Sequence, residues 1–306
     1  MNKTFTAISL MVILSFTGFP GGIVRAFDGN RAFKLLKKQV AFGPRNPGSP
    51  GHLAGKKFLL AELSRYTSNI QKQEFMHYDP VHKKTVLMTN IIARFNPQLE
   101  ARILLCAHWD SRPFADQDPL PANRKKAIPG ANDGASGVAV LLEIARQLKV
   151  KLPPIGVDIV LFDGEDFGRE GDLDEYFQGS RYFTKHNSSF FPKYAILLDM
   201  VGDAQLFLPV EGYSSLYAPD VVKKVWEIGQ SLGYSEFSSR VNGYIDDDHV
   251  ILNKAGIPAI DIIDFAYPDA SNKYWHTLQD TPDKCSPRSL KIVGDVLLKL
   301  VYTERP

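Results

Sequence analysis

Hydrophobic positions along the chain follow two periods, and segments of the two kinds alternate from residue 31 onward. Apolar residues three and four positions apart predict helices, whereas short unbroken apolar runs predict strands that are buried on both faces. Helices are predicted over 31–40, 58–63, 133–148, 180–186, 221–232, 248–254 and 290–302, and strands over 86–95, 102–107, 159–162, 194–198 and 258–263. This alternation predicts a single α/β domain, in which a central, mainly parallel twisted sheet carries helices on both faces.

The first 26 residues differ from the rest of the chain. Lys3 precedes an uncharged stretch over 4–18, and the segment ends on a small residue, Ala26, that suits cleavage. This is the layout of a secretory signal peptide, because the apolar part is short for a membrane span. We therefore expect a signal peptide at 1–26, one globular domain at 27–306, and a secreted or periplasmic protein without an integral membrane segment after cleavage. An uncleaved anchor is the alternative.

Charge and cysteine content narrow the classes of partner. Without Lys3 and Arg25, 34 basic residues remain against 34 acidic ones. A neutral mature chain offers no electrostatic argument for binding nucleic acid or an anionic membrane. The two cysteines, Cys106 and Cys285, are too few for a disulfide framework. We expect a buried free thiol at Cys106, which lies in an apolar run, and whether the two cysteines pair stays open.

An acidic loop follows the apolar run that ends at Phe162. Three acids, Asp163, Glu165 and Asp166, occur within four residues. In open α/β sheets, ligands bind at the carboxyl ends of the strands. Glu165 and Asp166 are therefore candidates for two different roles, in which one binds a metal and the other transfers a proton. The alternative is an acidic loop that caps the next helix.

Carboxylates and imidazoles recur where other predicted strands end or helices begin. The further candidates are His108, Asp133, Asp199, Asp247, Asp248 and His276. Each has a structural alternative: Asp133 and Asp248 can cap helices, and a single His is more often structural than a ligand. Their order along the chain nevertheless favours one site, and mixed carboxylate and imidazole ligands without a thiolate suit a catalytic zinc.

This order of motifs resembles the zinc-dependent aminopeptidase superfamily. The shared motifs are His108-x-Asp110, Gly130-x-x-Asp133, the acidic pair Glu165-Asp166, Leu198-Asp199 and His276-Thr277. Within it, the chain resembles the glutaminyl cyclase branch in Phe162-Asp163-Gly164-Glu165, Gly179-Ser180-Arg181, Asp247-Asp248-His249 and Trp275-His276-Thr277. The resemblance covers roughly residues 42–302, and it implies the fold of these zinc enzymes.

The resemblance implies a set of metal ligands. By position, Asp133, Asp166 and His276 correspond to the ligands of the single-zinc cyclases. Animal cyclases usually carry Glu where this chain has Asp166, so the metal is expected nearer to its strand or the loop shifted. His108 and Asp199 correspond to positions that hold a second zinc in the two-zinc aminopeptidases, and this second site stays open.

The resemblance also implies catalytic and substrate-binding residues. Glu165 corresponds to the general acid/base, and Asp199 and Asp247 correspond to carboxylates that share protons with it. Trp275 corresponds to the aromatic wall of the substrate pocket, and we expect His108 to contribute to that pocket as well.

The activity implied is that of a glutaminyl-peptide cyclotransferase acting on the N termini of peptides or proteins. The free amine of an N-terminal Gln attacks its own side-chain amide, pyroglutamate forms and ammonia leaves. A secreted zinc aminopeptidase is the alternative, because the same residues can hydrolyse the first peptide bond. A binding protein on a decayed enzyme fold is a third interpretation, disfavoured by the intact ligand set. We expect a monomer.

Overall fold

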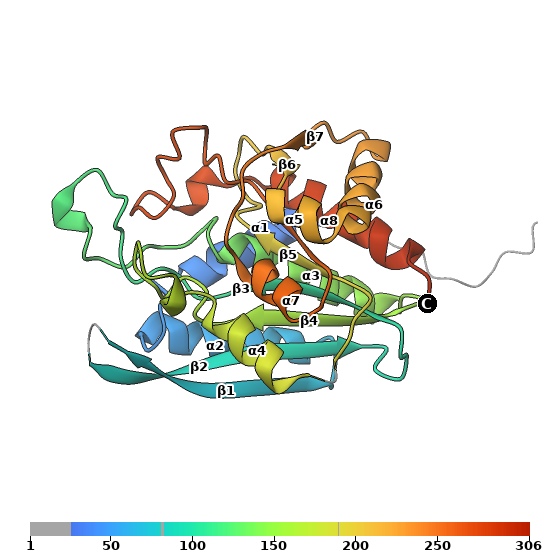
Figure 1. The fold of residues 1–306 in the computed structure, drawn as a ribbon, viewed down its shortest axis with the longest axis horizontal. Coiled ribbons are helices and arrows are strands. Elements are labelled where there is room, and N and C mark those ends of the chain that lie inside the picture. Colours follow the sequence, from blue (N-terminus) through green and yellow to red (C-terminus); the bar gives the residue numbers. More distant parts are fainter. Residues whose placement is uncertain (1–25, 81–82, 189) are drawn as a thin grey trace, which may run out of the picture.

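The fold is built around a six-stranded mixed sheet with strand order β1-β2-β4-β3-β5-β8 (Figure 1). The computed structural model describes residues 26–80, 83–188 and 190–306. The strands of the sheet are β1 (Ile70–Asp79), β2 (Lys84–Phe95), β3 (Arg102–His108), β4 (Gly156–Phe162), β5 (Ala195–Asp199) and β8 (Ala259–Ile263). Strand β3 pairs parallel with β4 and β5, and β5 pairs parallel with β8, whereas β2 pairs antiparallel with β1 and β4. The predicted α/β class with a mainly parallel sheet is confirmed.

Helices cover both faces of this sheet. The larger core cluster joins α1 (Gly29–Val40), α2 (Pro50–Ser64), α3 (Ala135–Val150), α6 (Pro219–Ser231) and α8 (Pro287–Thr303) to one face. The opposite face packs on α4 (Gln178–His186) and α7 (Asp248–Lys254). Neighbouring strand residues divide between the two cores: Leu105 belongs to the first and Cys106 to the second. This period of two is what a strand buried on both faces requires.

Smaller elements complete the domain. Strands β6 (Leu208–Val210) and β7 (Phe237–Val241) form a separate two-stranded sheet near α5 (Gly212–Tyr217) and α6 (Figure 1). Short 3₁₀ turns lie at Pro121–Asn123, Leu173–Glu175 and Pro282–Lys284. The apolar pattern missed β1 because most of its side chains are not buried, as expected of an edge strand. It also missed β6 and β7.

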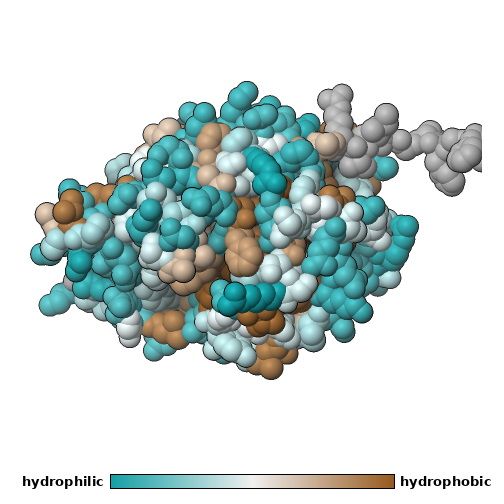
Figure 2. All heavy atoms as spheres, turned by 90° about the horizontal axis from the view of Figure 1, so that it is seen from above, coloured by the Kyte–Doolittle hydropathy of each residue, from teal (hydrophilic) through white to brown (hydrophobic). Residues whose placement is uncertain are grey.

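The surface and the N terminus bear on the remaining expectations. On the face seen in Figure 2 the surface is mainly hydrophilic, with apolar side chains in small groups. The expected signal peptide at 1–26 lies outside the described residues, apart from Ala26. Among the helices of the described part, none combines the length and apolar character needed to cross a bilayer. Cys106 and Cys285 are buried free thiols in different core clusters, as expected for Cys106.

Candidate active site

One cavity of about 390 Å³ collects most of the expected site residues. Because β3, β4, β5 and β8 run parallel, their carboxyl ends meet at the same edge of the sheet, and the loops that begin α3 and α7 and precede α8 close around it. The cavity is lined by Asp133, Glu165, Asp166, Asp199, Asp247, Trp275 and His276, among others. His108, expected in the substrate pocket, is 1% exposed and lies beneath this layer.

Three of these residues have the spacing of zinc ligands. One ligand atom each from Asp133, Asp166 and His276 lies within 4.8 Å of the others. The Nε2 atom of His276 is 3.5 Å from Oδ2 of Asp133 and 3.4 Å from Oδ1 of Asp166. A tetrahedral zinc with bonds of about 2.0–2.1 Å places its ligand atoms about 3.3–3.4 Å apart. The spacing therefore fits a single zinc ion.

The chemistry of these donors fits a metal as well. Oδ2 of Asp133 and Oδ2 of Asp166 are buried and have no hydrogen-bond partner in the part of the chain that the structure describes. Such buried carboxylate oxygens are costly unless a cation or a donor compensates them. Burial, together with the positive charges of Arg112 and His108, lowers the pKa of His276 well below its usual value. The imidazole is therefore neutral, as a metal ligand must be.

Glu165 stands beside this ligand set as a titratable group. Its side chain is 13% exposed and lines the cavity. Burial, together with the neighbouring Asp247 and Asp166 carboxylates, raises the pKa of Glu165 well above its usual value. Burial and the nearby Asp199 and Asp248 raise the pKa of Asp247 in the same way. Carboxyls that interact in this way titrate as a group, and a raised pKa lets such a group hold a proton at a pH at which a free carboxyl has lost it.

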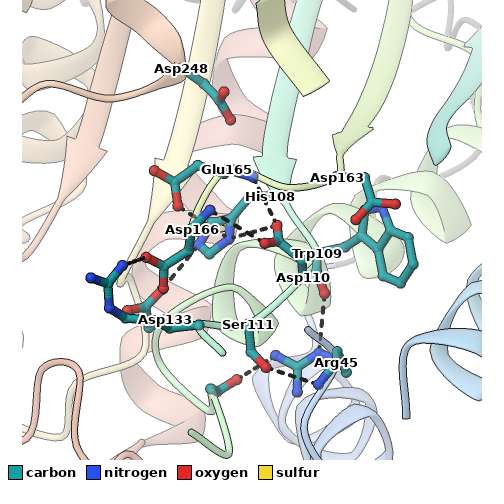
Figure 3. A network of polar contacts seen from close by, with 12 residues as sticks. Arg45, His108, Trp109, Asp110, Ser111, Asp133, Asp163, Glu165, Asp166 and Asp248 are labelled. Carbon is teal, nitrogen blue, oxygen red and sulfur yellow. Dashed lines mark hydrogen bonds and ion pairs between the residues drawn. The ribbon is translucent and has the colours of Figure 1, made fainter. Parts of the chain in front are cut away.

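Two residues without an assigned role in the sequence position the loops of the site. The Asp110 carboxylate accepts the backbone N–H groups of Glu165 and Asp166, at 3.2 and 3.3 Å. Arg45 is fully buried, and its guanidinium donates to the carbonyls of Trp109 at 3.1 Å and Gly130 at 2.6 Å (Figure 3). It thereby ties the end of β3 to the loop that carries Asp133. Asp110 follows a strand end and is part of the His108-x-Asp110 motif. Arg45 meets its partners only through the fold: its backbone N–H, for example, donates to Ser111, 66 residues later, and nothing in its local sequence indicates this role.

Asp163, the first acid of the loop after β4, does not belong to the site. Its carboxylate lies 2.9 Å from Nε2 of His52 and accepts the N–H of Thr89 at 2.6 Å. In Figure 3 it lies beside Trp109, away from Glu165. Of the three acids in this loop, only the second and third reach the cavity.

His108 forms a second group of potential ligands. Its Nε2 atom lies 3.2 Å from Oδ1 of Asp133 and 3.1 Å from Oδ1 of Asp199. Burial opposes its charge, but hydrogen bonds with Asp110, Asp133 and Asp199 raise the pKa of His108 well above its usual value. The ligand atoms of His108, Asp133 and Asp199 also lie within 4.8 Å of one another, so this group could hold a cation as well.

An aromatic wall closes one side of the cavity. The rings of Trp275 and His276 stack with centroids 3.7 Å apart, and Trp275 meets Phe265 edge-on at 5.1 Å. His276 has a φ of +53° and Met200, which follows the strand end at Asp199, has a φ of +48°. Left-handed backbone at residues other than glycine costs energy and clusters at functional sites.

Comparisons with known proteins agree with this geometry. The sequence model described as peptidase family M28 matches residues 90–301. The solved glutaminyl cyclase of Tannerella forsythia is 38% identical, with a TM-score of 0.87 over 92% of this chain and 100% of that chain. A solved Zn-dependent exopeptidase from Parabacteroides distasonis is 36% identical, with the same TM-score and coverage. The glutaminyl-peptide cyclotransferase of Boiga dendrophila is 25% identical over 290 residues, which cover 83% of this chain and 75% of the relative. The chain belongs to peptidase family M28.

Proposed function

We propose that this protein is a zinc-dependent glutaminyl-peptide cyclotransferase, which converts the N-terminal Gln of peptides and proteins to pyroglutamate and releases ammonia. The observation that carries the proposal is Glu165, a cavity-lining carboxyl of raised pKa, next to the ligand set of Asp133, Asp166 and His276. The similarity to the solved glutaminyl cyclase and to the curated cyclotransferase supports it.

Each residue has a definite task in this reaction. Asp133, Asp166 and His276 would hold a zinc ion, which would supply Lewis-acid chemistry at the substrate amide carbonyl. Glu165 takes a proton from the attacking α-amine and returns it to the leaving amide nitrogen, which departs as ammonia. Asp199 and Asp247 share protons with it. Trp275 packs on the Gln side chain and excludes water, and because the attack is intramolecular, holding the two groups in place supplies much of the rate.

Hydrolysis of the first peptide bond is the second candidate. The observation that favours it is the His108–Asp133–Asp199 group, whose ligand atoms also lie within 4.8 Å of one another. Were a second metal to displace the proton from His108, an activated water would serve as nucleophile, with Glu165 as its base. The raised pKa of His108 weighs against this arrangement, because a protonated imidazole cannot bind a metal.

Mass spectrometry of a peptide that begins with Gln separates the two activities. Incubation with zinc-loaded protein is expected to remove ammonia and leave the rest of the peptide intact. The same peptide with an acetylated N terminus lacks the attacking amine and should stay unchanged, as should a peptide that begins with Leu. Release of free Gln or free Leu would replace the cyclase proposal by an aminopeptidase.

We further propose that residues 1–26 are an export signal and that 27–306 form the catalytic domain, which meets peptide N termini outside the cytoplasm as a monomer. The uncharged stretch before Ala26 supports export. N-terminal sequencing of the mature protein should begin at Phe27, and light scattering should give the mass of one chain. A mature N terminus at Met1 would contradict export by this route.

A further inference from the structure

Arg112 contacts one of the three candidate zinc ligands. Its Nη1 atom donates a 2.7 Å hydrogen bond to Oδ1 of Asp166, and the side chains are 1% and 3% exposed. Among the described residues, Oδ2 of Asp166 has no hydrogen-bond partner. Arg112 therefore holds Oδ1, the oxygen that also lies 3.4 Å from Nε2 of His276, and thereby fixes the orientation of the whole carboxylate.

The guanidinium is itself held rigidly. Asp116 accepts from it at both oxygens, from Nε at 2.8 Å and from Nη2 at 2.6 Å. Nη2 also donates to the hydroxyl of Tyr176 at 2.8 Å. A forked, bidentate pair of this kind sets the plane of the guanidinium, which a lysine ammonium cannot do. The pair with Asp116 therefore sets the direction of the hydrogen bond from Nη1 to Asp166, whether or not a metal is bound.

The segment 110–112 contacts both the backbone of the Glu165–Asp166 pair and the side chain of Asp166. Asp110 accepts the two backbone N–H groups of the pair, and Arg112, two residues later, binds the Asp166 side chain. We propose that Arg112 is the positioning residue for Asp166: anchored by Asp116 and Tyr176, it aims the Asp166 carboxylate at the metal.

The same anchor lies close to a second ligand. Oδ1 of Asp116 is 3.7 Å from Nδ1 of His276, the ring atom that does not face Asp133 and Asp166. Partners outside the ligand set that orient metal-bound side chains usually contribute about 10–100-fold in metal affinity. The Arg112–Asp116 pair therefore binds one candidate ligand, Asp166, and lies near a second, His276, while adding no net charge of its own.

Zinc affinity of metal-stripped protein, measured by competition with a chromogenic chelator, tests this role. Arg112→Met removes both the charge and the fork, and it should weaken zinc binding by about 10–100-fold. Arg112→Lys keeps the charge but cannot reach Asp116 and Asp166 together, so its affinity should fall between those of Arg112→Met and the wild type. Tyr176→Phe removes the hydroxyl that accepts from Nη2 of Arg112 and leaves the bond between Arg112 and Asp166 in place. It should weaken zinc binding by a smaller factor than Arg112→Met.

Arg102, whose side chain is 11% exposed, provides a control for the loss of an arginine that forms a bidentate ion pair. It forms a bidentate pair with Asp158, at 2.8 Å for both bonds, at the opposite end of β3. Arg102→Met should lower the melting temperature of the metal-free protein yet bind zinc like the wild type. If Arg112→Met does not fold, Arg112→Lys and Tyr176→Phe decide the question alone.

The outcomes separate this inference from the proposed function on which it rests. Wild-type zinc affinity in all of the Arg112 and Tyr176 variants that fold, or tighter binding in Arg112→Met, would overturn the positioning role and leave the zinc enzyme intact. Absence of zinc binding by the wild-type protein would overturn both.

Discussion

The Nε2 atom of His108 lies 3.1 Å from Oδ1 of Asp199, a hydrogen-bond distance. The Nε2 atom of His276 lies farther from its acidic neighbours, at 3.5 Å from Asp133 and 3.4 Å from Asp166. Two imidazoles face the same Asp133 carboxylate, His108 at 3.2 Å and His276 at 3.5 Å. The pKa of His108 is raised and that of His276 is lowered, so the neutral His276 is the imidazole available to a metal. We therefore expect a single zinc per chain at neutral pH, countable by plasma emission spectrometry, and a reproducible count of two would contradict this expectation.

Removing the imidazole ligand should remove the metal. His276→Ala deletes one of three protein ligands, and we expect its zinc affinity to fall by at least about 100-fold, beyond the effect of changing a residue outside the ligand set. The measurement is zinc content after dialysis against a weak chelator. His186→Ala, an exposed imidazole on α4, is the control and should retain full zinc. Full occupancy in His276→Ala would move the ligand elsewhere.

Replacing the proposed acid/base should separate binding from turnover. Glu165→Gln keeps the shape of the side chain but cannot carry the proton, so kcat on a Gln-initiated peptide should fall by about 10²–10⁴-fold. Zinc content and melting temperature should stay near those of the wild type. Glu227→Gln, at an exposed site on α6, should leave all three unchanged. A wild-type rate in Glu165→Gln would show that another group moves the proton.

Trp275 allows a test of the pocket wall. Trp275→Leu removes the ring that stacks on His276 and meets Phe265. We expect KM for the Gln peptide to rise by about 3–30-fold, as the loss of about 0.7–2 kcal/mol of apolar contact predicts, with zinc content unchanged. Trp275→Phe should recover part of the loss. If KM stays constant while the melting temperature falls, the indole is a packing residue.

The C-terminal Glu304 should make folding stability depend on pH. Burial would raise its pKa, but hydrogen bonds from Lys224, Tyr194 and Lys193 outweigh burial and lower the pKa of Glu304 to about 2. Because the folded pKa lies below the unfolded value, this carboxylate stabilises the fold above about pH 4.5. The contribution disappears as the pH falls toward 2.

Urea unfolding of Glu304→Gln against the wild type measures this contribution. We expect a deficit of roughly 1–2 kcal/mol at pH 7, at the lower end for hydrogen bonds to a charged group, since solvent screens part of the site. The deficit should shrink by pH 3. A deficit that is equal at both pH values would mean that the variant loses packing rather than charge.

Much of the architecture can be predicted from local pattern. The largely apolar runs that form β3, β4, β5 and β8 can be recognised because strands buried on both faces carry few polar side chains. The edge strand β1 could not be found in this way, because water on one face permits polar residues at alternate positions. Its place is decided by pairing with β2, a contact that no local pattern encodes.

The sequence by itself determined which residue types follow each buried strand, and so the candidate ligands and the acid/base pair. Only the tertiary structure decided that Asp163 faces His52 while Asp166 faces Arg112, because two residues of one loop can point to opposite sides. The tertiary structure also decided which arginines hold the loops of the site. Arg112 binds Asp166, 54 residues away along the chain, and Arg45 binds the carbonyl of Trp109, 64 residues away. Such distant partners meet only once the sheet has formed.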